Sequence, residues 1–168
     1  MVDWRTAAGR WMLPTAAMAA VMLSTSASAQ EDRAVPYWAS ISSGQAMMRT
    51  GPGRNFPGIW LYQRRDLPVK VVQRYDNWRK IEDPDGTTGW MAVALLSDRR
   101  TVLVTAEAPI AVRASDSANS PTRYRAEPGV VGRVEECNGN ACLVRFGERE
   151  GWVSQDDVWG ADENEEIN

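Results

Sequence analysis

The 168-residue sequence contains no histidine and only two cysteines. Without histidine the chain cannot form a Ser-His-Asp or Cys-His catalytic arrangement, nor a zinc site with imidazole ligands. Two cysteines are also too few for a metal site built from four thiolates. These absences argue against most familiar hydrolases and metalloenzymes, so we expect no catalytic residues, no metal and no cofactor.

The sequence also lacks an excess of basic residues. It has 19 Lys and Arg against 22 Asp and Glu, a net charge of −3, whereas a general nucleic-acid binder needs a basic surface. Neighbouring acids such as Glu135 and Glu136 would point to opposite faces of a strand, so they do not form an acid and base pair. We therefore expect neither a nucleic-acid partner nor an enzyme.

Long apolar runs are missing except near the N-terminus. Residues 1–29 combine early arginines, a mostly apolar stretch from Trp11 to Leu23, and the small residues Ala27-Ser28-Ala29. A membrane anchor is the alternative, but this stretch is shorter than the roughly 20 residues that cross a bilayer. The pattern predicts a signal peptide cleaved before Gln30, a periplasmic or secreted protein, and no membrane anchor.

The remaining chain contains an internal repeat. Met48-Arg49 followed by Gly89-Trp90 returns as Val112-Arg113 followed by Gly151-Trp152, with the arginines 64 and the tryptophans 62 positions apart. This spacing predicts a duplicated domain of about 60 residues. We expect one copy over residues 36–97, a second over 101–160, and an acidic disordered tail over 161–168.

Each copy is predicted to consist of short strands. Leu67, Val69 and Val71 alternate with other residues, as in a half-buried strand. Asp83-Pro84-Asp85-Gly86 has the composition of a tight turn, and Asn138-Gly139 is a strong hairpin signal. No long helical period is present, although residues 92–96 could form one 3₁₀ turn. Small all-β units of this kind usually close into barrels.

These residues also resemble a known family. Met48-Arg49-x-Gly51-Pro52-Gly53, then Trp78-x-x-Ile81, then Asp85-Gly86-x-x-Gly89-Trp90 is similar to the skeleton of the bacterial SH3-like domain, and to its exported subgroup with two such domains. The second copy departs from it, since Ala111-Val112-Arg113 is not followed by Gly-Pro-Gly and Ala141 stands where an aromatic residue is common.

The resemblance implies an all-β protein with two tandem five-stranded, SH3-like barrels. It also implies a binding or targeting role, commonly at the cell wall. We therefore predict a non-catalytic exported module that binds cell-wall peptide, peptidoglycan or a protein partner in the periplasm. The alternative is a structural accessory subunit that docks on an envelope enzyme.

The first copy carries the candidate ligand-binding surface. If Ile59 and Leu61 face the core, alternation places Trp60 and Tyr62 outside, beside two arginines. Aromatic rings next to arginines suit a sugar, a peptide or an acidic glycan. Packing against the other copy or the N-terminal segment is the alternative. The loop from Thr50 to Pro57 and this strand together supply the candidates Arg54, Phe56, Trp60, Tyr62, Arg64 and Arg65.

The two cysteines bracket a four-residue turn. That spacing would bring Cys137 and Cys142 opposite each other on neighbouring strands, within reach of a disulfide bond. A redox-active pair is the alternative, but the spacing is not Cys-x-x-Cys and no helix N-terminus is expected there to lower a thiol pKa. We predict a structural disulfide that stabilises the second copy.

The charge is distributed unevenly. Residues 36–100 hold 10 Lys and Arg against 6 Asp and Glu, whereas residues 101–160 hold 6 against 9. The final segment adds four more acids. Such a distribution suits solvated surface, contact between the acidic tail and the basic first copy, or contact between that copy and acidic wall polymers.

Overall fold

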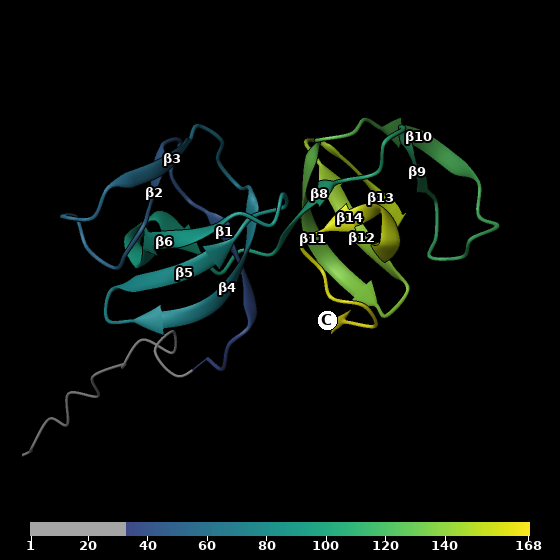
Figure 1. Ribbon diagram of the computed structural model, residues 1–168. Helices are drawn as coiled ribbons and strands as arrows, with labels where there is room; N and C mark the ends of the chain where they lie inside the picture. Colours follow the sequence, from purple (N-terminus) through teal and green to yellow (C-terminus); the bar gives the residue numbers. More distant parts are fainter. Residues whose placement is uncertain (1–32) are drawn as a thin grey trace, which may run out of the picture. The chain divides into compact units, whose positions relative to one another are not determined.

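A computed structural model describes residues 33–168 of the chain. The predicted signal peptide at residues 1–29 lies outside this range. Residues 33–168 form one compact unit of β-strands with two short 3₁₀ turns (Figure 1). Within that range no helix is long and apolar enough to cross a membrane.

The first copy is an antiparallel sheet in which the strands pair in the order β3-β2-β6-β5-β4-β1-β7. Short alternating segments and tight turns produce it, as the sequence predicts. One 3₁₀ turn, η1 (Val93–Leu95), precedes its last strand, as expected for residues 92–96. Its strands are β1 (Tyr37–Ile41), β2 (Ala46–Arg49), β3 (Gly58–Tyr62), β4 (Pro68–Tyr75), β5 (Trp78–Glu82), β6 (Thr88–Ala92) and β7 (Leu96–Ser97).

The second copy repeats this arrangement in the order β10-β9-β13-β12-β11-β8-β14. Its 3₁₀ turn, η2 (Gln155–Asp157), occupies the place of η1. An additional strand, β15 (Glu166–Ile167), pairs with β11. The others are β8 (Thr101–Val104), β9 (Ile110–Arg113), β10 (Thr122–Ala126), β11 (Val131–Asn138), β12 (Ala141–Phe146), β13 (Arg149–Ser154) and β14 (Val158–Trp159).

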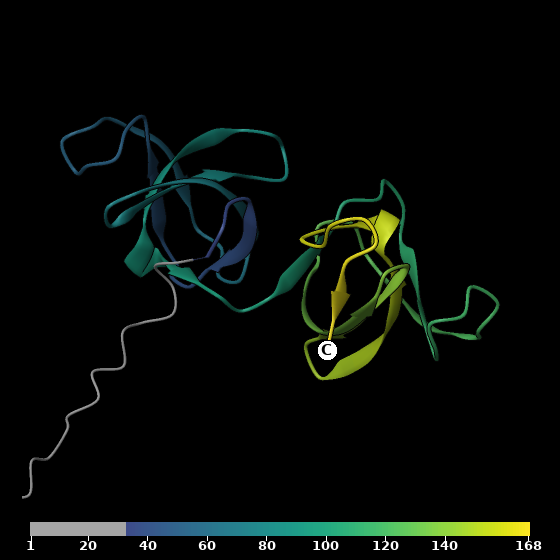
Figure 2. The ribbon, with the colours of Figure 1, turned by 90° about the horizontal axis from the view of Figure 1, so that it is seen from below.

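The register of the two sheets supports the duplication. Arg49 pairs with Trp90 in the first copy and Arg113 with Trp152 in the second, and these are the residues that identify the repeat in the sequence. Neither sheet closes into a ring, because β3 and β10 each pair on one side only. The predicted all-β fold of two tandem SH3-like units is thus confirmed, although each unit is a curled sheet that does not close into a barrel (Figure 2).

Each sheet encloses its own apolar core. Alternate residues of the strands point inward, as period-two patterning requires. The largest fully buried side chains of the first core are Ile41, Met48, Val69, Val71, Ile81 and Met91; those of the second are Val102, Val104, Val112, Val144 and Val153.

The glycine of the Gly-Trp pair is required in each copy for a steric reason. A Cβ atom on Gly89 would lie 2.5 Å from Met48 Cγ, and one on Gly151 would lie 2.6 Å from Val112 Cγ1. Because such contacts are shorter than packed atoms tolerate, only glycine allows β6 and β13 to approach the neighbouring core strands.

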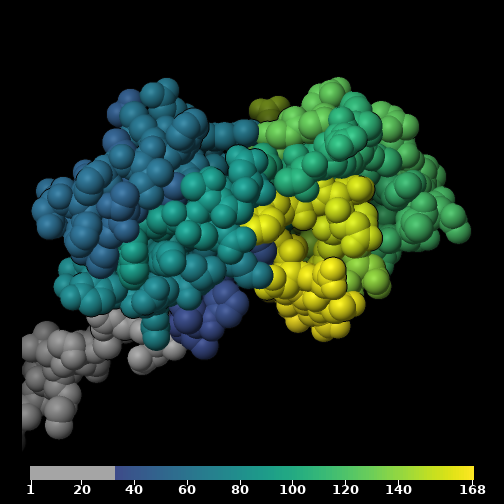
Figure 3. All heavy atoms as spheres, in the orientation of Figure 1, coloured from purple at the N-terminus to yellow at the C-terminus, as the bar shows by residue number. Residues whose placement is uncertain are grey.

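The C-terminal segment differs from the expected disordered tail. β15 pairs with β11 through Cys137↔Ile167 and Asn138↔Glu166, and Ile167 packs against the second core. In the space-filling view the C-terminal residues, coloured yellow, form part of the surface of the second copy (Figure 3). Its acidic composition suggested disorder, but the segment contributes an apolar residue and pairs with a sheet.

Candidate functional site

A groove of about 340 Å³ lies beside β3 of the first copy. One wall is β3, and the opposite wall is the turn between β5 and β6. Leu103 of β8 also lines it. The other lining residues are Ile59, Trp60, Tyr62, Leu67, Asp83, Pro84, Asp85 and Thr87.

Asp83 fixes the turn that forms the second wall. Its Oδ1 accepts hydrogen bonds from the backbone N–H groups of Asp85 and Thr87, at 3.1 and 2.8 Å. Gly86 N–H donates to Asp83 O at 3.0 Å, and Gly86 has a φ of 77°, which glycine adopts readily. The predicted turn at residues 83–86 is thereby confirmed, and it holds Pro84 at the rim of the groove.

A buried hydrogen bond joins the two walls. Tyr62 Oη donates to Asp83 Oδ2 at 2.7 Å, and both side chains are buried. Burial raises the pKa of the Tyr62 phenol, and the hydrogen bond to Asp83 and the negative charges of Asp83 and Asp85 raise it further. The phenol therefore stays neutral over a wide pH range and holds β3 against the turn.

Apolar side chains are concentrated on β3 and the loop before it. Trp60 is 61% exposed, and Phe56, Ile59 and Leu61 are also exposed. β3 ends the strand order of its sheet, so one of its edges is unpaired within residues 33–168. An exposed apolar edge strand is a ready template for strand addition by a peptide.

The predicted orientation of β3 is wrong for Tyr62. Ala46 lies opposite Tyr62 and Met48 opposite Trp60, and residues that lie directly opposite share one face of a sheet. Because Ala46 and Met48 are buried, Trp60 and Tyr62 lie on the core side. Tyr62 is only 6% exposed, whereas Trp60 projects at the open edge.

The other candidates lie outside the groove. Phe56 packs over the loop that precedes it, so closely that a Cβ atom on Gly51 would lie 2.4 Å from its ring. Arg64 Nη2 donates to Gly129 O of the second copy, which matches the packing alternative. Arg54 and Arg65 are exposed.

The sequence interpretation missed the acidic turn as part of the site. Its composition predicted a turn, but the side of the sheet that it faces depends on pairing between distant strands. The signal in the sequence is the position of Asp83, because an aspartate at the start of a turn accepts hydrogen bonds from several donors. Tyr62 supplies one of them.

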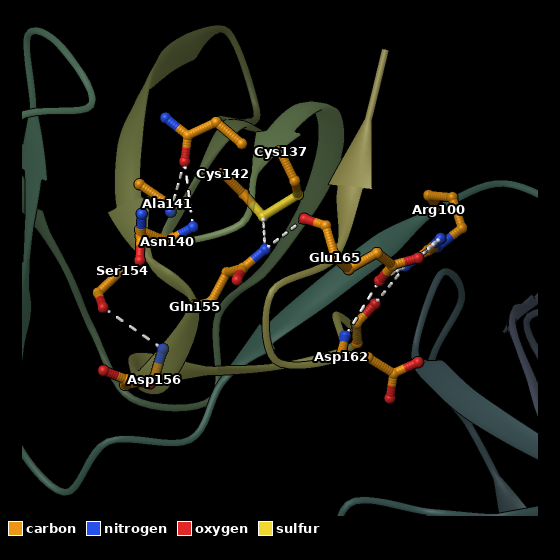
Figure 4. The surroundings of a disulfide bond; sticks show 12 residues. Arg100, Cys137, Asn140, Ala141, Cys142, Ser154, Gln155, Asp156, Asp162 and Glu165 are labelled. Carbon is orange, nitrogen blue, oxygen red and sulfur yellow. Dashed lines mark hydrogen bonds and ion pairs between the residues drawn. A yellow bond between two sulfur atoms is a disulfide. The ribbon is translucent and has the colours of Figure 1, made fainter.

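The cysteines form the predicted disulfide bond between Cys137 and Cys142. It joins paired positions of β11 and β12, and both residues are buried. Gln155 Nε2 lies 3.6 Å from Cys142 Sγ and donates to Glu165 O at 2.9 Å (Figure 4). The disulfide thus joins the two strands of the β11–β12 hairpin, next to the C-terminal segment that pairs with β11.

Comparison with solved structures gives distant similarities. NlpC2 from Trichomonas vaginalis matches with 8% identity and a TM-score of 0.33, over 74% of this chain and 48% of its own. NlpC1 from the same organism matches with 8% identity and a TM-score of 0.33, over 76% and 46%. This chain therefore spans about half the length of each, and similarities this distant carry no argument about function.

Comparison with protein families identifies the family of this chain. No curated protein matches the chain. The family profile described as "Bacterial SH3 domain" matches twice, over residues 42–98 and 106–160. These two segments cover most of the chain. The first spans β2 to β7 and the second spans β9 to β14, whereas β1, β8 and β15 lie outside them. The chain therefore belongs to the bacterial SH3 domain family, of which it carries two tandem copies.

Proposed function

We propose that this protein is an exported, non-catalytic binding module, and that the groove beside β3 holds an extended peptide of the cell wall. The observation that carries the proposal is the exposed apolar edge of β3 next to a preformed groove. Bacterial SH3 domains are binding modules, and the disulfide fits an oxidising compartment outside the cytoplasm.

The groove offers both parts of a peptide site. The unpaired edge of β3 supplies backbone N–H and C=O groups that can pair with an extended chain. Trp60 and Pro84 supply apolar surface for its side chains, and the carboxylate of Asp85 supplies an acceptor at the rim. Affinity would come from Trp60, because large aromatic residues dominate binding energies at such surfaces.

Co-sedimentation of the purified protein with isolated sacculi tests this proposal. We expect the wild type to sediment with the sacculi and Trp60→Ala to lose at least about tenfold in affinity. Tyr75→Ala is the matched control, because Tyr75 is 59% exposed but lies away from the groove. Equal sedimentation of both variants would place the binding surface elsewhere.

The second candidate function is docking on an envelope enzyme, which the same exposed apolar residues favour. A docking subunit would not sediment with purified sacculi. It would instead yield a defined crosslinked protein in intact cells, with a crosslinker placed at position 60 but not at position 75.

A further inference from the structure

The second copy has a cavity of its own, about 500 Å³ in volume. It lies on the face of β9, β12 and β13 that is opposite the core, since Arg113, Ala141 and Trp152 line it while their neighbours are core residues. We propose that this cavity binds a primary ammonium group on an alkyl chain, as in a lysine side chain or a free diamine. The proposal is independent of the groove beside β3.

Comparison of the two copies explains why the cavity exists. Trp78 lies opposite Ala92 in the first sheet, and Ala141 lies opposite Ser154 in the second. The hydrogen bond from Val93 N–H to Asn77 O, at 2.9 Å, returns as the bond from Gln155 N–H to Asn140 O, at 3.0 Å. Ala141 is therefore the counterpart of Trp78, and the second copy lacks the indole ring that the first copy has there.

The same comparison shows a change of charge at the rim. η1 contributes Ala94 and Leu95, while the equivalent positions of η2 are Asp156 and Asp157. The loop after β9 adds Asp116 and the C-terminal segment adds Glu163. The second copy has thus exchanged apolar side chains for carboxylates around a space from which a large ring is missing.

Three of these carboxylates are available to a ligand, whereas Asp116 Oδ2 accepts a hydrogen bond from Asn138 Nδ2 at 2.9 Å. Asp156, Asp157 and Glu163 form no ion pair within residues 33–168. The one cation in the lining, Arg113, donates from Nη1 to Ser120 O at 3.1 Å. Four acids against one arginine leave an excess negative charge in the lining, which favours a cation.

Trp152 favours an organic cation, because it supplies an aromatic surface for a cation–π contact. Gln155 also lines the cavity, and its side-chain amide donates from Nε2 to Glu165 O at 2.9 Å. Its Oε1 is buried and is not presented to the open cavity. Figure 4 shows the Gln155 side chain directed toward the disulfide and Glu165, with Asp156 on the other side of its backbone.

The arrangement of the acids indicates an ammonium group on a chain in preference to a metal ion. Within the described residues no three carboxylates cluster closely enough to hold a metal. The acids instead border the cavity from separate segments. An ammonium group directs its three donors out of one plane, whereas a guanidinium directs a planar fork at a single carboxylate.

NMR titration of the ¹⁵N-labelled protein tests the proposal with three probes. These are a capped Gly-Gly-Lys-Gly-Gly peptide, the same peptide with norleucine in place of lysine, and 1,5-diaminopentane. We expect the lysine peptide or the diamine to shift the Trp152 indole and Gln155 amide resonances. Whichever binds more tightly identifies the source of the ammonium group. The norleucine peptide should leave both resonances unchanged.

Two kinds of variant make the test specific. Ala141→Trp restores the first-copy residue and should abolish the shifts. Asp156→Asn with Asp157→Asn should weaken binding by about tenfold or more if the ion contacts are desolvated. Glu127→Gln with Glu148→Gln makes the same charge change on exposed residues outside the cavity and should have little effect. Equal shifts from the lysine and norleucine peptides, or unchanged binding by the two acidic-site variants, would overturn the proposal.

Discussion

The phenol of Tyr62 connects two segments that are far apart in the chain. It donates to Asp83, whose other oxygen holds two backbone N–H groups of the β5–β6 turn. A buried carboxylate needs all of these donors, because it has lost its contacts with water. The hydrogen bond therefore stabilises the first copy and also sets the distance between the walls of the groove.

Replacing Tyr62 by phenylalanine should lower the free energy of unfolding by about 2 kcal/mol, since it removes a buried hydrogen bond to a charged group. Denaturant unfolding at pH 7 measures this change. Tyr75→Phe is the control, because Tyr75 is exposed. Loss of its hydroxyl should lower the free energy of unfolding by less than about 0.5 kcal/mol.

Tyr62 should also make the stability of the protein depend on pH in the alkaline range. Because the pKa of Tyr62 is raised above its ordinary value of 10.0, its contribution to stability is fully present below pH 10 and is lost as the pH rises above it. Wild type should lose stability between pH 9.5 and 11 more steeply than Tyr62→Phe. Parallel curves would show that Tyr62 ionises normally in the folded protein.

At the scale of elements, the two copies stabilise the same hairpin differently. β4 and β5 bring Arg74 opposite Arg79, and the buried Arg79 donates to the carbonyl oxygens of Asp76 and Trp78. In the second copy the equivalent positions carry the disulfide between β11 and β12. One hairpin is therefore held by hydrogen bonds from a guanidinium and the other by a covalent bond.

Reduction of the disulfide should destabilise the second copy by about 2 kcal/mol on the chain-entropy model, because the closed loop is short. Thermal unfolding with and without dithiothreitol measures this, and the Cys137→Ser, Cys142→Ser double variant should match the reduced protein. Backbone hydrogen exchange should rise in β11 and β12 while β4 and β5 keep their protection. Unchanged unfolding would contradict a stabilising role.

The carboxylate of Glu165 adds an anchor to the C-terminal segment, besides the pairing of β15 with β11. Arg100 donates from Nη1 and Nη2 to Glu165 Oε1 and Oε2, at 2.7 and 2.8 Å, and the Asp162 N–H donates to Oε2 at 3.0 Å. Burial alone would raise the pKa of Glu165, but these hydrogen bonds and the charge of Arg100 outweigh it, so the pKa is lowered. The segment is thus anchored at neutral pH.

Acid should therefore release the C-terminal segment. Since the folded-state pKa of Glu165 is lowered, its contribution is present above the ordinary glutamate value of about 4.3 and is lost as the pH falls below it. Hydrogen exchange of residues 162–167 at pH 7 and pH 3, expressed as protection relative to the intrinsic exchange rate at each pH, should show the loss. Glu165→Gln should show low protection at both values, whereas Glu148→Gln should behave as wild type.

At the scale of the whole molecule, aromatic and charged contacts connect the two copies. The rings of Trp38 and Trp159 meet edge to face, with centroids 4.9 Å apart. Lys70 lies over Trp38 and pairs with Asp162 at 2.7 Å. The ion pair is partly exposed, so solvent screens it, whereas Trp38 is buried.

The burial of Trp38 should contribute more to the free energy of unfolding than the ion pair between Lys70 and Asp162. Trp38→Ala should lower the free energy of unfolding by about 3–5 kcal/mol, as large-to-small changes of buried aromatic residues do. Asp162→Asn should lower it by less than about 1 kcal/mol. Denaturant unfolding at low and high salt separates the two effects, because only the second is sensitive to salt. A larger loss from Asp162→Asn would show that the charge dominates.

Local patterns determined much of this protein without any structure. The spacing of the repeat, the turn at Asp83 and the disulfide were predictable because each depends on residues close in sequence or on a recurring skeleton. The tertiary structure decided what depends on distant pairing. Opposite Ala46, Tyr62 points into the core, and β11 recruits the acidic tail as a strand. Alternation shows that a strand has two faces, but only its partner strands determine which of them is buried.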